Sequence, residues 1–489
     1  MKHVYPTTWR GQFLIAESVP DAPDAWRHRL RKLEILGFDP LQKILVRDAA
    51  GQCVGTLLGA PVDARAGRLP EDIYQAGSVA GEDIDAFVER EIMSLTGSWL
   101  FLLDAPGARR LYMDAAGSLP AVYRPETRSV AATSLLLLEP GEERARFRQD
   151  LYDTLDILRD GWFPAGLTAH EGVFRLMPNH YLDLDDFTTH RHWPQGEIAP
   201  TGDPHAACGR ILECMRATMR PCLAREGLSI TLTAGNETRM LLAAARPFHE
   251  KAEFVTVDSH EARLDRVRAG ELARRFGLNH RLVPIEQASA EQACEWHART
   301  GYCAGGPHLK THPTAARLAP DTWLVGGVSG EVGRGFFWRE SDDDDTEITP
   351  EGLWARMGLP SHPDGIEAVA DWLEEVRGLP SLLKLDLAYL ELRVGSWGFD
   401  TVYASPVRRP LQPLVSRAVY SAMLSLPHDW RRMQGHSNRM VQEVIRQGWP
   451  DLLDLPIGCY GDWRDKTRLV ARALKNPHLV LKVLRKRFG

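Results

Sequence analysis

The chain has 489 residues, a formal net charge of −6, and hydrophobic and charged fractions of 44% and 25%, values typical of a globular protein with two or three domains. The negative charge provides no global basic field for nucleic acid, no run approaches the roughly 20 apolar residues of a membrane span, and the first ten residues lack an apolar signal core. Seven cysteines without C-x-x-C spacing favour reduced, structural thiols and a cytoplasmic location.

Residues 1 to about 145 alternate short apolar runs with turn residues, which is the pattern of a β-rich domain. The clearest part is 97–123, which reads as strand, hairpin turn, strand, glycine turn and strand. A helical segment over 83–94 interrupts this pattern. The expected strands are 13–16, 43–46, 99–103, 110–113, 121–123 and 129–132.

Residues 148–195 form a connector. We expect a helix over 151–161 and a turn into a strand over 174–185. The segment 193–204 is rich in proline and glycine, as domain boundaries often are. The sequence therefore predicts one domain over 1–195 and a second over 205–489.

From residue 205 onward, helices and strands alternate, which favours a parallel sheet covered on both faces. Ligands of such sheets bind at the carboxyl ends of the strands. The turns at 233–238 and 326–331 would both lie on that edge. The expected strands are 228–232, 253–258, 281–285 and one leading from 321 into the second turn, the expected helices are 205–225, 238–245 and 262–276, and 350–489 is mostly helical.

The turn at 233–237 combines features of an anion site. Backbone amides and the positive end of the following helix dipole would face whatever lies over the turn. Hydroxyls of Thr231, Thr233 and Thr238 add donors, and the Glu237 carboxylate could hold a metal beside a phosphate. Many strand–turn–helix units bind nothing, so an anion site and an ordinary turn both stay open.

Two motifs carry a family resemblance. Thr233-Ala-Gly-Asn-Glu-Thr-Arg239 fits S-G-G-x-D-S-R, and Gly327-Val-Ser-Gly-Glu-Val332 falls on G-x-G-x-D-E. These are marks of the synthetase domain of the asparagine synthetase family, an ATP-pyrophosphatase fold, which residues 205–460 resemble. Further marks follow in the family's order at 255–258, 278–280, 391–393, 408–411 and 449–456.

The first half resembles the family's glutaminase-type domain, an α+β sandwich with an N-terminal nucleophile, over 97–133 and 174–185. Such a domain needs a cysteine directly after the initiator methionine, where its free amine serves as the base. Here position 2 is Lys2, and the first cysteine is Cys53. We therefore expect a retained sandwich without glutaminase activity, and an amine that does not come from glutamine.

The resemblance implies a reaction in which ATP and Mg²⁺ activate a carboxylate, pyrophosphate leaves and an amine attacks. Such catalysis is mainly positioning and electrostatic stabilisation. Glu237 and Glu331 fall on the family's metal-binding and catalytic acids, and Arg439 could supply positive charge to the leaving pyrophosphate. The implied ATP contacts are Leu232, Thr233, Ala234, Gly235, Asn236, Thr238, Val257, Gly326 and Gly327.

Several positions depart from the family pattern. Val328 and Val332 stand where the family has acidic residues, and Asn438 falls near an expected lysine, so Arg439 or His436 would have to replace its charge. Separately, His308 and His312 have the i,i+4 spacing of a helical metal site.

Two functions therefore stay open. One is an amide ligase or cyclase, similar in kind to lasso-peptide cyclases and β-lactam synthetases, that acts on a metabolite, glycan or peptide carboxylate. The other is a non-catalytic relative that binds a nucleotide or a partner. Sulfur transfer lacks support because no C-x-x-C pair lies near the loops. A homodimer is compatible with either function.

Overall fold

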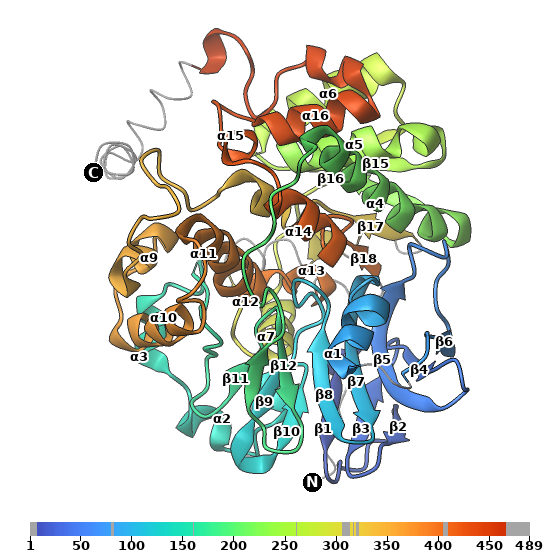
Figure 1. The fold of residues 1–489 in the computed structure, drawn as a ribbon, viewed down its shortest axis with the longest axis vertical. Helices are drawn as coiled ribbons and strands as arrows, with labels where there is room; N and C mark the ends of the chain where they lie inside the picture. Colours follow the sequence, from blue (N-terminus) through green and yellow to red (C-terminus); the bar gives the residue numbers. More distant parts are fainter. Residues whose placement is uncertain are drawn as a thin grey trace.

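The computed structural model describes residues 7–79, 83–159, 161–260, 262–305, 313–315, 317–318, 322–403 and 409–465. The fold is mixed α/β (Figure 1), with sheets of six and seven strands in the first half and a five-stranded sheet in the second. Over these ranges, every helix is too short or too polar to cross a bilayer.

The two sheets of the first half form a sandwich around a shared core. Phe13 and Ile35 of one sheet and Leu100 and Leu111 of the other belong to the same buried cluster. The six-stranded sheet, in the order β11-β9-β10-β1-β3-β2, contains β1 (Phe13–Ala16), β2 (Ala25–Arg29), β3 (Glu34–Phe38), β9 (Val122–Arg124), β10 (Ser129–Ala131) and β11 (Phe174–Arg175). The seven-stranded sheet, in the order β13-β12-β8-β7-β5-β4-β6, contains β4 (Lys43–Arg47), β5 (Cys53–Val62), β6 (Ile73–Gln75), β7 (Thr96–Ala105), β8 (Ala108–Met113), β12 (His180–Asp183) and β13 (Thr189–Arg191).

All six strands predicted for the first half are present, while its helices differ in detail. The segment predicted over 83–94 is α1 (Ile84–Phe87), which continues as a π-helical turn over Val88–Ile92. The helix predicted over 151–161 is wrong in length. It is α3 (Gln149–Thr154), and it ends early because Asp156 adopts a left-handed backbone with φ of 52°. A further short helix is α2 (Glu142–Ala145).

The second half contains the predicted parallel sheet, in the order β16-β15-β14-β17-β18. All four strand pairs are parallel. Since β14 and β17 are neighbours, their carboxyl ends lie side by side. The strands are β14 (Leu228–Thr231), β15 (Glu253–Asp258), β16 (His280–Pro284), β17 (Trp323–Val325) and β18 (Arg409–Leu411), and β18 was not predicted.

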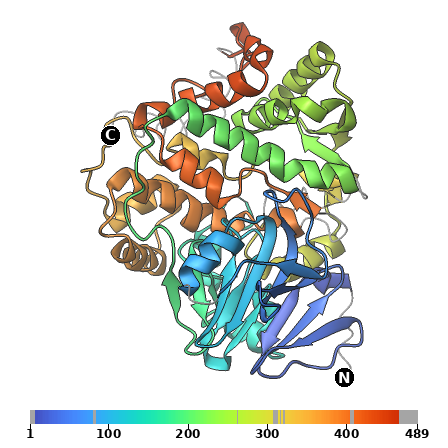
Figure 2. The same cartoon turned by 45° about the vertical axis from the view of Figure 1, so that its right-hand side comes forward.

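Helices pack around this sheet and fill the rest of the second half. Figure 2 shows the long helix α4 (Pro204–Arg225) above the sandwich, and the Thr218 hydroxyl of α4 donates to Thr96 Oγ1 of β7 at 3.2 Å. The remaining helices described in the second half are α5 (Asn236–Ala245), α6 (Arg263–Phe276), α7 (Ala290–Thr300), α9 (Pro350–Met357), α10 (Pro363–Glu375), α11 (Ser381–Ala388), α12 (Gly395–Trp397), α13 (Asp400–Tyr403), α14 (Arg417–Leu424), α15 (His428–Arg431) and α16 (Arg439–Gly448).

Candidate functional site

The turn between β14 and α5 is held mainly by its own side chains. The Thr233 and Thr238 hydroxyls lie 2.8 Å apart, and the Gly235 amide donates to Thr233 Oγ1 at 3.1 Å. The Thr231 hydroxyl donates to the carbonyl of Val325 on β17 at 3.0 Å. The three hydroxyls predicted as ligand donors therefore hold the turn in shape and join the two strands.

One acidic side chain reaches the turn from the next helix. Asp265, in the first turn of α6, accepts a hydrogen bond from the Ala234 amide at 2.9 Å. A carboxylate at this position uses one of the amides that an anion would need. The predicted anion site at this turn is therefore partly occupied by a carboxylate of the protein itself.

Asn236 keeps unused hydrogen-bonding capacity. It is the first residue of α5, so its backbone N–H group has no acceptor within the helix. Its side chain is buried, Nδ2 donates to the carbonyl of His436 at 2.9 Å, and Oδ1 has no partner among the described residues. A buried polar atom without a partner is costly, so Asn236 is the member of the turn best suited to contact a ligand.

The glycine-rich loop after β17 packs directly on the turn. A Cβ on Gly327 would lie 2.5 Å from Cβ of Glu237, and a Cβ on Gly330 would lie 2.5 Å from Cγ of the same residue. Side chains at either position would push the loop away. The two loops thus meet at the carboxyl edge of the sheet, where the strand pattern predicts them.

Glu237 and Glu331 share one cation, Arg334. The Arg334 Nη2 atom lies 2.6 Å from Glu237 Oε1 and 3.2 Å from Glu331 Oε1. Burial, and next the charge of Glu331, raise the pKa of Glu237 to about 7, while the Arg334 guanidinium opposes this shift. Burial and the second carboxylate therefore outweigh the ion pair at Glu237.

A π-helical segment, Tyr389–Val394, supplies two further groups. Burial, followed by the charge of Glu331, raises the pKa of Tyr389 well above its usual value. Arg393 lies with its guanidinium carbon 4.8 Å from the ring centres of both Trp162 and Phe336. π-Helical turns are rare and often occur at functional sites.

Leu232, Val257 and Gly326, predicted as nucleotide contacts, lie at the ends of three neighbouring strands. Leu232 follows β14 and is buried, and Val257 is a half-buried residue of β15. Gly326 follows β17, and a Cβ there would lie 2.7 Å from Gln412 Oε1. The structure therefore brings these residues to the same edge as the turn.

Arg439 is not brought to this edge. It is exposed, its guanidinium pairs with Asp429, and it stacks over Trp430 at 4.6 Å. Asn438, near the expected lysine, is buried and caps α16 by accepting from the Val441 amide at 2.9 Å. Of the residues in this loop, His436 contacts the turn, through its carbonyl.

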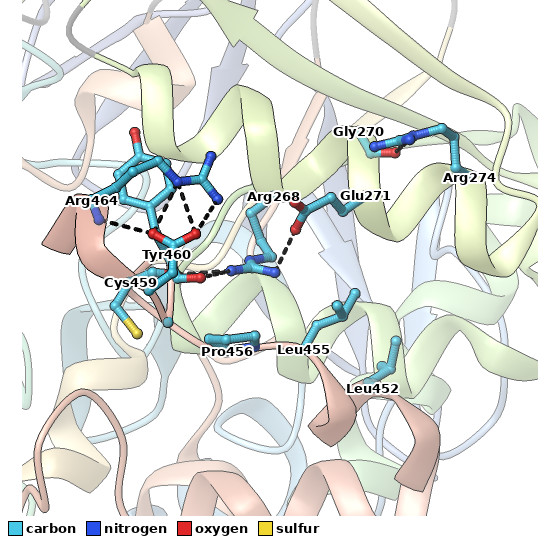
Figure 3. A network of polar contacts seen from close by, with 12 residues as sticks. Arg268, Gly270, Glu271, Arg274, Leu452, Leu455, Pro456, Cys459, Tyr460 and Arg464 are labelled. Carbon is cyan, nitrogen blue, oxygen red and sulfur yellow. Dashed lines mark hydrogen bonds and ion pairs between the residues drawn. The ribbon is translucent and has the colours of Figure 1, made fainter.

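Two buried arginines hold the segment 452–460 against the turn. Arg239 of α5 and Arg268 of α6 donate to its backbone carbonyls, and Figure 3 shows the Arg268 contacts. The Gly458 amide donates to the Ala234 carbonyl at 2.7 Å. The acceptors are the carbonyls of Leu452 at 2.7 Å, Leu455 at 3.1 Å and Pro456 at 3.2 Å for Arg239, and of Cys459 at 3.0 Å and Tyr460 at 3.1 Å for Arg268.

A divalent ion does not fit the carboxylate pair as it is arranged. Carboxylate oxygens are suitable ligands for Mg²⁺, but the Arg334 guanidinium already contacts one oxygen of Glu237 and one of Glu331. Within the described ranges, no group of three histidine, cysteine, aspartate or glutamate side chains is placed to hold a metal. Lys2, His308 and His312 lie outside the described residues.

Arg334, Tyr389 and Asp265 belong to the site, but the sequence did not predict them as site residues. Arg334 had a usable signal, since a cation three residues after an acid faces that acid in a tight helical turn. Tyr389 had none, because it reaches the site from a different part of the chain.

No protein-family model matches the sequence, and no curated protein is significantly similar to it. Several solved structures are weakly similar, and three of them, described next, have TM-scores below 0.2. NMN synthetase from Francisella tularensis is 12% identical with a TM-score of 0.19, over 57% of this chain and 96% of that chain. The B. subtilis glutamine PRPP amidotransferase, complexed with ADP and GMP, is 12% identical with a TM-score of 0.19, over 53% of each chain. NAD⁺ synthetase from Burkholderia pseudomallei is 13% identical with a TM-score of 0.18, over 53% of this chain and 90% of that chain.

Proposed function

We propose that the protein is an ATP-dependent ligase that activates a carboxylate and joins it to an amine, releasing AMP and pyrophosphate. The observation that carries this proposal is the contact between the two loops, in which Gly327 and Gly330 pack on Glu237 at the carboxyl edge of the parallel sheet. Open parallel sheets bind ligands at this edge. The helix α5, which starts at Asn236, directs its positive dipole end there.

Bound ATP would supply an adenylyl group that makes the carboxylate reactive, with pyrophosphate as the leaving group. In this proposal the backbone amides of Asn236 and of the rest of the first turn of α5 donate hydrogen bonds to the pyrophosphate. Leu232, Val257, Gly326 and Gly327 line the rest of the nucleotide.

The substrate is a small-molecule, glycan or peptide carboxylate. The amine is supplied directly rather than from glutamine, because Lys2 stands where a glutaminase needs its cysteine. The chain's own contribution is to fix the two reactants in line, which can account for most of the rate enhancement in such reactions.

Pyrophosphate exchange tests the proposal. The protein is incubated with ATP, labelled pyrophosphate, magnesium and a panel of free amino acids, sugar acids and acidic peptides, and label in ATP is followed. We expect exchange that depends on one carboxylate class and is lost in Asn236→Pro, which removes the backbone donor at a first helical position that tolerates proline. Glu367→Ala, at an exposed site on α10, should exchange normally. Absence of exchange with every carboxylate, together with absence of ATP binding in calorimetry, would refute the proposal.

A second function, nucleotide binding without turnover, is favoured by a specific observation. Two amides of the turn are already bonded, that of Ala234 to Asp265 and that of Gly235 to Thr233. In addition, the Asn438 side chain is occupied as a helix cap rather than free to contact phosphate. This function predicts ATP binding in calorimetry with no pyrophosphate exchange for any carboxylate.

A further inference from the structure

Arg334 lies between the two acids that the sequence singles out. Its Nη2 atom contacts Oε1 of Glu237 at 2.6 Å and Oε1 of Glu331 at 3.2 Å. The three side chains are mostly shielded from solvent, with 14% of Glu237, 14% of Arg334 and 23% of Glu331 exposed. The two carboxylates are therefore neutralised in part by a cation that belongs to the chain.

The backbone holds Arg334 in this position. Glu331 and Arg334 belong to the 3₁₀-helical turn Gly330–Arg334, in which side chains three residues apart eclipse one another. Ser329 and Gly335, on either side of the turn, have φ of 72° and 53°. These left-handed residues end the turn at both sides, and a Cβ on Gly335 would lie 2.4 Å from the Trp338 ring. The guanidinium is thus placed by a short, well-bounded element.

Glu237 is held just as firmly from the other side. It is the second residue of α5, and both Gly327 and Gly330 lie against its aliphatic carbons. Tyr389 is buried, and it lies close enough to Glu331 for that charge to raise its pKa. Neither carboxylate can move far without displacing a loop or a buried tyrosine.

A divalent ion and Arg334 would compete for the same oxygens. A guanidinium stays charged near neutral pH, so it cannot make room by losing a proton. Two cations at contact distance repel strongly where solvent is largely excluded. The same loop offers no additional acid, because Val328 precedes the turn and Val332 follows Glu331 within it.

We propose that Arg334 is the resident cation of the Glu237–Glu331 pair and takes the place that a divalent metal ion would need. While Arg334 is present, these two carboxylates bind no metal, and their charge is balanced by the chain. Removal of the guanidinium converts the pair into a metal site. The proposal concerns the proposed nucleotide site, but it is tested by metal binding and needs no turnover, so its failure is distinguishable from failure of the proposed function.

Manganese serves as the probe because electron paramagnetic resonance reports free Mn²⁺ directly. The full chain is titrated without nucleotide as wild type, Arg334→Gln, and Arg334→Gln combined with Glu331→Gln. We expect no Mn²⁺ uptake at the pair in the wild type. Arg334→Gln should bind about one Mn²⁺ per chain, with an affinity at least about ten-fold above the detection limit that the wild type does not reach, which corresponds to ~1.4 kcal/mol, and the double variant should lose this binding. Arg377→Gln removes the same charge from an exposed site and should behave as wild type.

A second readout is the melting temperature. A ligand that binds only the folded state raises it, so Mn²⁺ should raise the melting temperature of Arg334→Gln and leave that of the wild type unchanged. Two outcomes overturn the proposal: Mn²⁺ uptake by the wild type that Glu331→Gln abolishes, or failure of folded Arg334→Gln to bind Mn²⁺. The first outcome uses no variant of Arg334, so the proposal stays testable even if Arg334→Gln does not fold.

Discussion

Gly330 and Glu237 touch because Gly330 has no side chain. A Cβ on Gly330 would lie 2.5 Å from Cγ of Glu237 and 3.0 Å from Cδ1 of Leu414. The φ of Gly330 is not in the left-handed region, so the requirement for glycine is one of space. The close approach of the two loops therefore depends on this contact and on that of Gly327 with the same glutamate.

We expect Gly330→Ala to separate the loops. Since the Glu237 and Leu414 side chains surround the new methyl group, overpacking should lower the free energy of unfolding by about 1–3 kcal/mol, measured by urea denaturation. ATP affinity measured by calorimetry should fall as well. The matched control is Gly270→Ala within α6, where a Cβ meets nothing within 4 Å and where alanine should stabilise the helix by about 0.5–1 kcal/mol. Equal stability of Gly330→Ala and wild type would contradict this account of the contact.

Local sequence patterns predicted the framework of the site. Thr231 and Glu237 belong to a strand–turn–helix unit whose signals lie within about twenty consecutive residues, and alternation of helices and strands predicted a parallel sheet. That topology placed the second loop at Gly327 on the same edge of the sheet as Glu237, and the structure shows the two in contact because β14 and β17 are neighbours.

The remaining features depend on contacts between distant parts of the chain. β18 consists of three residues, one of which is a proline. It is a strand because β17 pairs with it. Asn438 resembles a site residue in the sequence, but its side chain bonds the carbonyls of Gly333 and Arg431 at 3.0 and 2.8 Å. Neither burial nor such partners can be read from residue type and spacing.

His170 should make stability depend on pH. It is buried, its Nδ1 lies 2.8 Å from Ser134 Oγ, and burial lowers its pKa to about 4. The unfolded chain then binds a proton between pH 6.5 and 4 that the folded chain does not. Stability is therefore fully present above pH 6.5 and is lost as pH falls toward 4, by up to ~3 kcal/mol.

The measurement is the free energy of unfolding from pH 4 to 7.5. His170→Asn should flatten the curve below pH 6.5, whatever its absolute stability. His260→Asn, at an exposed histidine, should keep the wild-type slope. If His170→Asn and wild type lose stability in parallel on acidification, His170 is not the group responsible.

Arg268 should control the mobility of the segment 452–460. Its guanidinium is buried and donates to the carbonyls of Cys459 and Tyr460. Arg268→Met keeps most of the volume but leaves these carbonyls without a donor, which should cost about 1–3 kcal/mol. Hydrogen exchange should speed up at 458–461.

Arg274→Met is the control, because Arg274 is exposed and bonds a carbonyl of its own helix at Gly270. It should change the free energy of unfolding by no more than about 0.5 kcal/mol, and it should leave the rate of hydrogen exchange in this segment unchanged. Unchanged exchange at 458–461 in Arg268→Met would show that other contacts, such as those of Arg239, are sufficient to hold it.

An added lysine should strengthen pyrophosphate binding at the turn only at a position that the structure brings close to the turn. Asn438→Lys would remove the cap of α16 and bury an ammonium group, so we expect destabilisation by about 3 kcal/mol or more and no gain in pyrophosphate affinity. His436→Lys places the same charge at an exposed residue whose carbonyl bonds Asn236. A partly screened charge there should strengthen pyrophosphate binding by about five-fold, or ~1 kcal/mol.

Gln434→Lys adds that charge at an exposed residue of the same loop and serves as the control. Calorimetry with inorganic pyrophosphate measures the affinities and urea denaturation the stabilities; tighter binding in Asn438→Lys than in His436→Lys would mean that position 438, rather than 436, faces the ligand.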